Sequence, residues 1–109
     1  MILATLKMNT LPEKRREFLQ TLQVLCTFIR NEKGCLSCNT FQDLENGNSF
    51  RLAYMWENRD DLDQHLRSDR FGVLLGTKTL LSRPLEIAIH MVSVTAGMEA
   101  VEAVRGKKA

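Results

Sequence analysis

The stretch "MWENRDDLDQHLRSDRF", Met55–Phe71, decides the fold, because one hydrophobic pattern ends within it and another begins. The residues up to Trp56 alternate in the manner of a strand, whose side chains point to opposite faces in turn. The residues that follow are typical of a helix: Asn58 can cap it, and the acidic residues of its first turn suit the positive end of the helix dipole. A strand therefore leads directly into a helix.

Trp56 and His65 are rare residue types, because the chain has one tryptophan and two histidines. At about 100° per residue, His65 lies about 60° from Leu62 around the helix and therefore borders its buried face. The two side chains can then meet at a cavity between helix and sheet, where they would suit an aromatic, hydroxylated ligand. The same residues also fit a core tryptophan and a boundary histidine bonded to a backbone carbonyl, so both interpretations stay open.

The segments around this stretch give the order β-α-β-β-α-β. Strands are expected at 2–9, 36–44, 50–57 and 85–94. A helix with an apolar stripe follows the first strand and stops at Gly34, and Thr10 and Glu13 have the spacing of a capping box at its start. The sequence "ENGN", 45–48, predicts a tight hairpin with positive φ angles. The second helical segment is broken, and its second piece runs over about 71–82.

This order predicts an α+β domain of the ferredoxin-like βαββαβ type with an antiparallel sheet, over residues 1–94. The helices cover one face of the sheet. The other face carries either Phe50, Leu52, Tyr54 and Trp56 or the residues that alternate with them, and it would be wet in a monomer. Such a face usually marks an interface, so we expect a homodimer with two sheets packed face to face. The last strand is apolar on both sides, so both are expected to be covered.

Residues 95–109 are expected to form a C-terminal tail. Met98, Val101 and Val104 are three residues apart, which fits either a short helix docked on a partner or a frayed end. The net charge is only +2 and the basic residues are dispersed, so no nucleic acid is expected as a partner. No apolar run approaches the roughly 18 residues of a membrane span. The chain starts without a signal-peptide pattern, and its three cysteines are expected to be free thiols in the cytoplasm.

Other polar groups give weaker signals. Cys35 and Cys38 form a C-x-x-C pair, but the pair opens a strand and has no further zinc ligands nearby, so two separate thiols and no metal site are expected. Asn39 and Tyr54 are polar residues on mostly apolar strands, and they either line a cavity or lie at the edge of the sheet. The sequence has no recognisable motif for binding phosphate, nucleotide or flavin.

The pattern W-E-x-R-x-x-L-x-x-H-L-x-S-x-x-F resembles the antibiotic biosynthesis monooxygenase family, and most closely its quinol monooxygenase-like branch. Its residues in this chain are Trp56, Glu57, Arg59, Leu62, His65, Leu66, Ser68 and Phe71. The resemblance implies a dimeric α+β barrel and a cofactor-independent monooxygenase that oxidises a small quinol or polycyclic phenol with O2 as co-substrate. In that scheme His65 orients or deprotonates the substrate hydroxyl, and Trp56 forms a wall against its ring.

The substrate pocket implied by this resemblance is expected to include Tyr54, Asn39, Leu52, Phe71 and Leu75. Leu52 stands where antibiotic-tailoring members carry an asparagine, and Leu75 stands where haem-degrading relatives carry a histidine ligand, so a haem site is not expected. The competing hypothesis is a non-catalytic dimeric module that binds a small aromatic molecule or regulates a partner enzyme. A closed apolar cavity containing His65 would favour catalysis, and a His65 facing solvent would favour the module.

Overall fold

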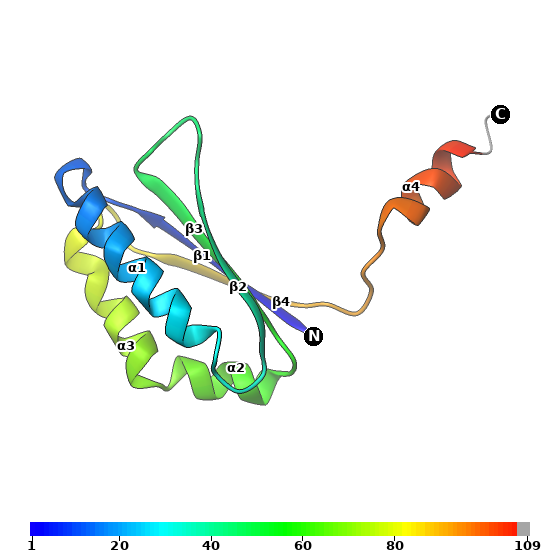
Figure 1. The fold of residues 1–109 in the computed structure, drawn as a ribbon, viewed down its shortest axis with the longest axis horizontal. Helices are drawn as coiled ribbons and strands as arrows, with labels where there is room; N and C mark the ends of the chain where they lie inside the picture. Colours follow the sequence, from blue (N-terminus) through cyan, green and yellow to red (C-terminus); the bar gives the residue numbers. More distant parts are fainter. Residues whose placement is uncertain (107–109) are drawn as a thin grey trace.

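The computed structural model describes residues 1–106, which form one sheet with helices packed on a single face and a last helix that stands apart (Figure 1). The strands are β1 (Ile2–Asn9), β2 (Cys35–Gln42), β3 (Ser49–Trp56) and β4 (Glu86–Met91). The helices are α1 (Arg15–Ile29), α2 (Arg59–Leu66), α3 (Asp69–Gly76) and α4 (Met98–Arg105), with short 3-10 helices at Pro12–Lys14 and Thr77–Leu80. This arrangement confirms the ferredoxin-like α+β fold. None of the helices within residues 1–106 has the length and apolar character that crossing a membrane requires.

The sheet has the strand order β2-β3-β1-β4, and every neighbouring pair is antiparallel. The apolar set of β3 that ends in Trp56 lies beneath the helices and is at most 2% exposed. The residues that alternate with this set, such as Arg51 and Met55, lie on the open face. The sequence left open whether the set ending in Trp56 or the residues between its members would lie on the open face. In the structure the residues between its members lie there. A strand shows its two faces in turn, so this choice holds for the whole of β3.

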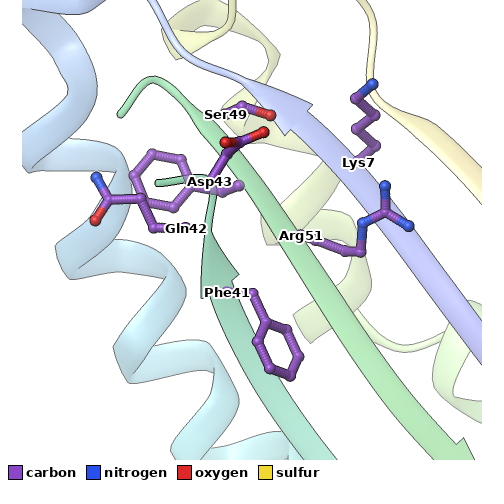
Figure 2. Close-up of a pocket in the computed structure, with 7 residues that line it drawn as sticks. Lys7, Phe41, Gln42, Asp43, Ser49 and Arg51 are labelled. Carbon is purple, nitrogen blue, oxygen red and sulfur yellow. The ribbon is translucent and has the colours of Figure 1, made fainter. Parts of the chain in front are cut away.

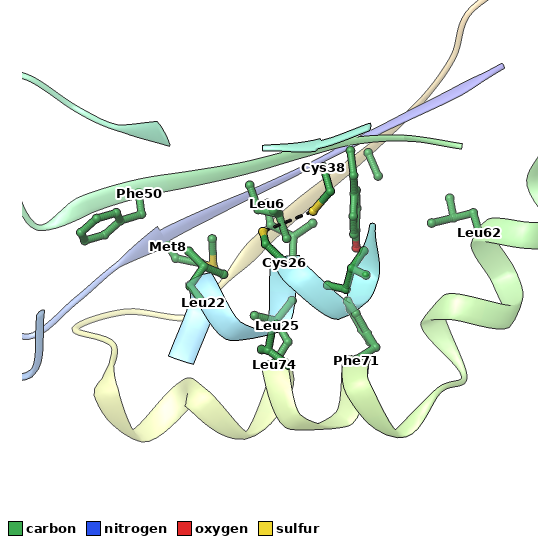
Figure 3. Close-up of a cluster of buried hydrophobic side chains, with 14 of the residues drawn as sticks. Leu6, Met8, Leu22, Leu25, Cys26, Cys38, Phe50, Leu62, Phe71 and Leu74 are labelled. Carbon is green, nitrogen blue, oxygen red and sulfur yellow. Dashed lines mark hydrogen bonds between the residues drawn. The ribbon is translucent and has the colours of Figure 1, made fainter. Parts of the chain in front are cut away.

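The hydrophobic core lies between this covered face and the helices (Figure 3). The apolar stripe of α1 faces the sheet, and five of its residues are buried: Phe18, Leu22, Leu25, Cys26 and Ile29. Leu62 from α2 and Phe71 and Leu74 from α3 complete the layer. The helical spacing of these residues places them all on one side, as the sequence predicts.

The predicted capping box at the start of α1 is wrong. Thr10 forms an isolated bridge with Leu81, and its hydroxyl donates to the carbonyl of Asn48 at 3.4 Å. Thr10 is therefore engaged by two other segments and does not cap the helix. The chain instead enters α1 through the 3-10 helix that follows Leu11, which has no side-chain cap.

The predicted tight turn at 45–48 is also wrong, because no positive φ angle occurs there. Residues 43–48 form a longer connection between β2 and β3. Within it the side chains of Asp43 and Asn46 each accept a hydrogen bond from the backbone N–H two residues further along, at 2.8 and 3.1 Å. Such local bonds to Asx side chains stabilise the connection without a left-handed residue.

The broken second helical segment is confirmed as α2, α3 and a final 3-10 turn. Asn58 caps α2 by accepting a hydrogen bond from the N–H of Asp61 at 2.9 Å. Ser68 caps α3 through the N–H of Phe71 at 3.2 Å, and its own hydroxyl donates to the carbonyl of His65 at 2.6 Å. These two caps set the directions of α2 and α3 relative to β3, because each joins a loop residue to the first turn of a helix.

The expectation that β4 is covered on both faces is wrong for the described chain. All six residues of β4 are exposed. Ile87 and Ile89 point to the side where the helices lie, yet they are 45% and 36% exposed. β4 is an edge strand, and no helix lies over it. After Met91 the chain leaves the domain, and α4 stands apart from it (Figure 1).

Gly34 is the only residue among 1–106 with a positive φ angle, +82°, and a Cβ there would overlap the carboxyl group of Asp61. We expect Gly34→Ala to lower the free energy of unfolding by about 1–3 kcal/mol, through backbone strain and this overlap. Gly72→Ala is the matched control: it has open space within α3, so it should raise stability by about 0.5–1 kcal/mol. Urea unfolding measures both. A Gly34→Ala midpoint equal to that of the unaltered protein would contradict this prediction.

Candidate active site

β3 and α2 bring Trp56 and His65 into contact. Trp56 is the last residue of β3, and Asn58 caps α2 two residues later, so α2 lies against the end of the strand. The indole and imidazole rings are stacked, with centroids 4.9 Å apart and 28° between their planes. Both side chains are buried, with exposures of 0% and 1%. His65 is thus part of the core. It lies deeper than the sequence predicts, which placed it at the border of the buried face of the helix.

Tyr54 and Phe71 complete an aromatic cluster around His65. The Tyr54 ring meets the imidazole edge-on at 5.1 Å, and the Phe71 ring meets it at 5.4 Å and 71°. Tyr54 also packs edge-on against Trp56 at 5.4 Å. Tyr54 and Trp56 share a face of β3 because they are two residues apart, and Phe71 arrives from α3. The aromatic cluster is therefore Tyr54, Trp56, His65 and Phe71.

A hydrogen-bonded chain runs through the cluster toward the surface. The Tyr54 hydroxyl and His65 Nε2 are 3.1 Å apart, and His65 Nδ1 lies 3.0 and 3.1 Å from the two carboxylate oxygens of Glu32. A carboxylate only accepts, so Nδ1 carries the proton and donates to Glu32, and Nε2 accepts from the Tyr54 hydroxyl. The Glu32 side chain is 14% exposed, and Arg70 lies 3.9 Å from its second oxygen. The Tyr54–His65–Glu32 chain thus joins a buried phenol to a carboxylate near solvent.

Burial changes the protonation of both inner members of this chain. Desolvation lowers the pKa of His65 below its ordinary 6.5, although the hydrogen bond and negative charge of Glu32 act in the opposite direction. Burial also raises the pKa of the Tyr54 phenol above its ordinary 10, and the neighbouring Cys38 and Glu32 add to the effect. At neutral pH His65 is therefore an uncharged base, and Tyr54 is a protonated donor.

The lowered His65 pKa predicts a pH dependence of stability. Below about pH 6.5 the unfolded chain binds a proton at His65 that the folded chain does not, so stability falls as the pH falls. The contribution is fully present above the unfolded pKa and is lost as the pH drops through the lowered folded pKa. Urea midpoints between about pH 7.5 and about pH 5 should therefore fall more for the unaltered protein than for His65→Gln. Parallel pH curves for the two proteins would contradict the assignment.

The structure separates two of the other three predicted pocket residues from the aromatic cluster. Asn39 pairs with Ala53 on the open face and is exposed, on the opposite side of the sheet from Tyr54. Leu52 is fully buried in the core beside β1. Leu75 is 48% exposed on α3 and lines a surface groove. Of the five residues expected to line the pocket, Tyr54 and Phe71 lie against His65, whereas Asn39 and Leu75 do not.

Sequence reasoning missed Glu32. It stands 33 positions before His65, in the turn after α1, and no periodic pattern connects the two. The one local signal is its place two residues before Gly34, whose carbonyl accepts from the N–H of Glu57 just beyond β3. That bond ties the turn to the end of β3, and so brings Glu32 toward α2.

Three cavities of the described chain lie outside the aromatic cluster. One of about 200 Å³ opens near the β2–β3 connection, where it is lined by Lys7, Phe41 and Arg51, among others (Figure 2). A second of about 330 Å³ includes Leu75, and a third of about 320 Å³ includes Val24 on α1. Neither Trp56 nor His65 lines any of these three. The rings of the cluster pack against one another in the core.

The cysteines form a contact that the sequence did not reveal. The Sγ atoms of Cys26 on α1 and Cys38 on β2 are 3.3 Å apart in the core (Figure 3). This contact and burial raise the pKa of the Cys38 thiol. Cys35 is only half-buried and points to the carbonyl of Ser37, which confirms that the C-x-x-C residues act as separate thiols. Residues 1–106 contain no cluster of three side chains suited to hold a metal ion.

Comparison with known proteins identifies the family. The fold is a ferredoxin-like α+β sheet with an aromatic cluster at the end of β3. Residues 1–74 match the family model for antibiotic biosynthesis monooxygenase. The chain therefore belongs to the antibiotic biosynthesis monooxygenase family, as the tryptophan–histidine motif predicts.

Individual relatives agree with this fold. A conserved protein from Methanosarcina mazei Go1 is 31% identical with a TM-score of 0.77, over 82% of this chain and 89% of that one. A proposed antibiotic biosynthesis monooxygenase from Deinococcus radiodurans has a TM-score of 0.83 at 20% identity, over 89% and 97% of the two chains. An uncharacterised Synechocystis protein is 33% identical over 85 residues, which are 77% of this chain. This chain spans 58% of the length of that relative.

Proposed function

We propose that this protein is a cofactor-independent monooxygenase that oxidises a small quinol or polycyclic phenol with O2. The observation that carries the proposal is the Tyr54–His65–Glu32 chain, in which a buried neutral imidazole is held between a phenol and a carboxylate at 3.0–3.1 Å. A base in this position suits a reaction that begins by removing the proton of an aromatic hydroxyl. Family membership supports the oxygenation that follows.

The hydrogen bonds define a route for that proton. Tyr54 donates its own proton to His65, so the lone pairs of its oxygen are free to accept from a substrate hydroxyl. When the substrate proton moves to Tyr54, the Tyr54 proton moves to His65 Nε2, and Glu32 stabilises the resulting imidazolium. The electron-rich substrate anion can then pass an electron to O2. The buried, stacked rings of Trp56 and His65 would exclude water from this electron transfer.

Trp56 supplies both a wall and a hydrogen-bond donor. Its ring lies against His65, and within residues 1–106 its buried Nε1–H has no hydrogen-bond partner. A buried donor without a partner is unfavourable, and a quinone or phenolate oxygen would satisfy it. We infer that the substrate oxygen lies between the Trp56 Nε1–H and the Tyr54 hydroxyl, with its ring beneath α2 and α3.

The second candidate function is a non-catalytic module that binds a small aromatic molecule or regulates a partner enzyme. It is favoured by one observation: both ring nitrogens of His65 are already bonded within the chain, and three aromatic rings pack around it. In this case the aromatic cluster stabilises the fold, and ligands bind elsewhere, as in the cavity of Figure 2.

We also propose that the protein is a homodimer in which two open sheet faces pack together. The centre of the open face carries small and apolar residues that are only partly exposed: Leu3, Thr5, Ala53 and Met55. Packing the same face of two copies together is a self-complementary arrangement that closes with two-fold symmetry. A monomeric mass in sedimentation equilibrium would contradict this proposal.

Oxygen consumption tests the enzyme directly. The metal- and flavin-free protein is mixed with a reduced naphthoquinol or an anthrone, and O2 uptake is compared with a protein-free blank and with His65→Ala. Uptake well above the blank that His65→Ala abolishes supports the monooxygenase. Uptake equal to the blank on several quinols and anthrones favours the binding module. A Soret shift on addition of haemin would instead indicate a haem site.

A further inference from the structure

The chain after β4 forms an arm that leaves the domain (Figure 1). Val92 donates its N–H to the carbonyl of Met1 at 2.9 Å, and this bond fixes the root of the arm beside β1. From Ser93 to Gly106 every residue is exposed. The arm therefore presents nearly all of its surface to solvent, including the whole of α4.

α4 has an apolar side that is exposed. Met98, Val101 and Val104 lie along this side and are 66%, 48% and 75% exposed. At about 100° per residue, Glu99 and Ala103 fall on the opposite side, and Glu102 lies at its flank. Isolated helices shorter than about 12–15 residues are marginal in water, and α4 has eight residues. A helix this short and amphipathic needs a surface to pack against.

The same chain carries an apolar surface that lacks a cover. It combines a groove of about 330 Å³ beside α3 with the helix-side residues of β4, and we call it the β4 groove. Its main residues are Leu74, Leu75, Leu81, Pro84, Leu85, Ile87 and Ile89. In the rest of the sheet this side is covered by helices, so the β4 groove is a gap in the helical layer. Leu75, Ile87 and Ile89 supply exposed apolar area here, at 48%, 45% and 36% exposure, and exposed apolar surface of this kind marks an interaction site.

We propose that α4 of one copy packs into the β4 groove of a second copy, so that two copies exchange their arms. Residues 92–97 run outward past the end of the sheet and hold α4 away from α3 of the same chain (Figure 1). Charge also fits: Lys78 lines the groove and forms no ion pair within residues 1–106, and Glu102 flanks the apolar side of α4. Reciprocal exchange of one element is a low-cost route to a dimer.

This inference does not depend on oxygenase activity, because it rests on surfaces away from the aromatic cluster. It adds a second contact to the proposed sheet-to-sheet dimer. It also gives β4 the cover that its apolar sequence predicted and that the single chain lacks.

Amide hydrogen exchange of α4, followed by NMR on the full chain, tests the exchange of arms. In the unaltered protein α4 amides should exchange at least about tenfold more slowly than in a free peptide. Val101→Glu on the arm and Ile87→Glu in the groove should each abolish this protection. Ala103→Glu places the same charge on the opposite side of α4 and should leave it intact. Protection in α1 checks that each variant folds, and Leu75→Glu replaces Ile87→Glu if the latter does not.

Mixing the two defective variants distinguishes exchange from folding back. Isotope-labelled Ile87→Glu has an intact arm and a damaged groove, and unlabelled Val101→Glu offers an intact groove. If arms are exchanged, co-refolding the two restores α4 protection in the labelled chain. If α4 packs on its own chain, mixing restores nothing, and the proposal is overturned. The proposal is also overturned if the α4 amides of the unaltered protein are not protected, or if Ala103→Glu removes their protection as fully as Val101→Glu does.

Discussion

Trp56→Ala will lower the free energy of unfolding by about 3–5 kcal/mol, the range for removing a large aromatic side chain from a packed core. Trp56 is fully buried, and it contacts both Tyr54 and His65 through their rings. The cavity left by the indole would lie beneath α2, which few other core residues support. Urea unfolding followed by far-UV circular dichroism measures the loss, because the only tryptophan is removed.

Phe28→Ala is the matched control for this prediction. Phe28 is also an aromatic residue, but it lies on α1 and is 50% exposed. We expect this variant to lose much less free energy of unfolding than Trp56→Ala, since less apolar area returns to water. Similar losses for the two variants would show that the aromatic cluster does not support the fold as described.

Tyr54→Phe will lower turnover of a quinol by about 10²-fold or more, the lower end of what a positioned acid–base group contributes. The substitution keeps the ring that packs on Trp56 and removes only the hydroxyl that joins the substrate to His65. The fold should persist with a modest loss of stability, because His65 Nε2 is left without its donor. Oxygen uptake at saturating substrate measures the change.

Glu32→Gln tests whether Glu32, at the outer end of the hydrogen-bonded Tyr54–His65–Glu32 chain, acts through His65. Its amide oxygen can still accept from Nδ1–H, but the negative charge is gone, so the pKa of His65 should fall further. The acid limb of the pH–rate profile should then move to lower pH while the maximal rate falls. Glu13→Gln removes an exposed carboxylate elsewhere and should change neither quantity. An unshifted acid limb in Glu32→Gln would leave Glu32 with a purely structural role.

Much of the fold was predictable from local patterns. Alternation located the strands, the helical stripe located α1, and Asn58 marked the start of α2. The contact between Trp56 and His65 could also be anticipated from the sequence, because the two residues lie nine positions apart across one strand–helix junction. Turn chemistry was less predictable: Thr10 and the 43–48 loop form bonds with partners that the local sequence does not specify.

The sequence by itself determined the family and the order of elements, and it made a contact between Trp56 and His65 one of two open possibilities, because each depends on residues close together in the chain. Only the tertiary structure decided that Glu32 bonds His65, that Cys26 meets Cys38, and that Asn39 faces away from the cluster. The exposure of β4 and α4 likewise appears only when the layers are assembled. Periodicity reports which side of an element is apolar, whereas the identity of what covers that side depends on segments that meet only after the chain has folded.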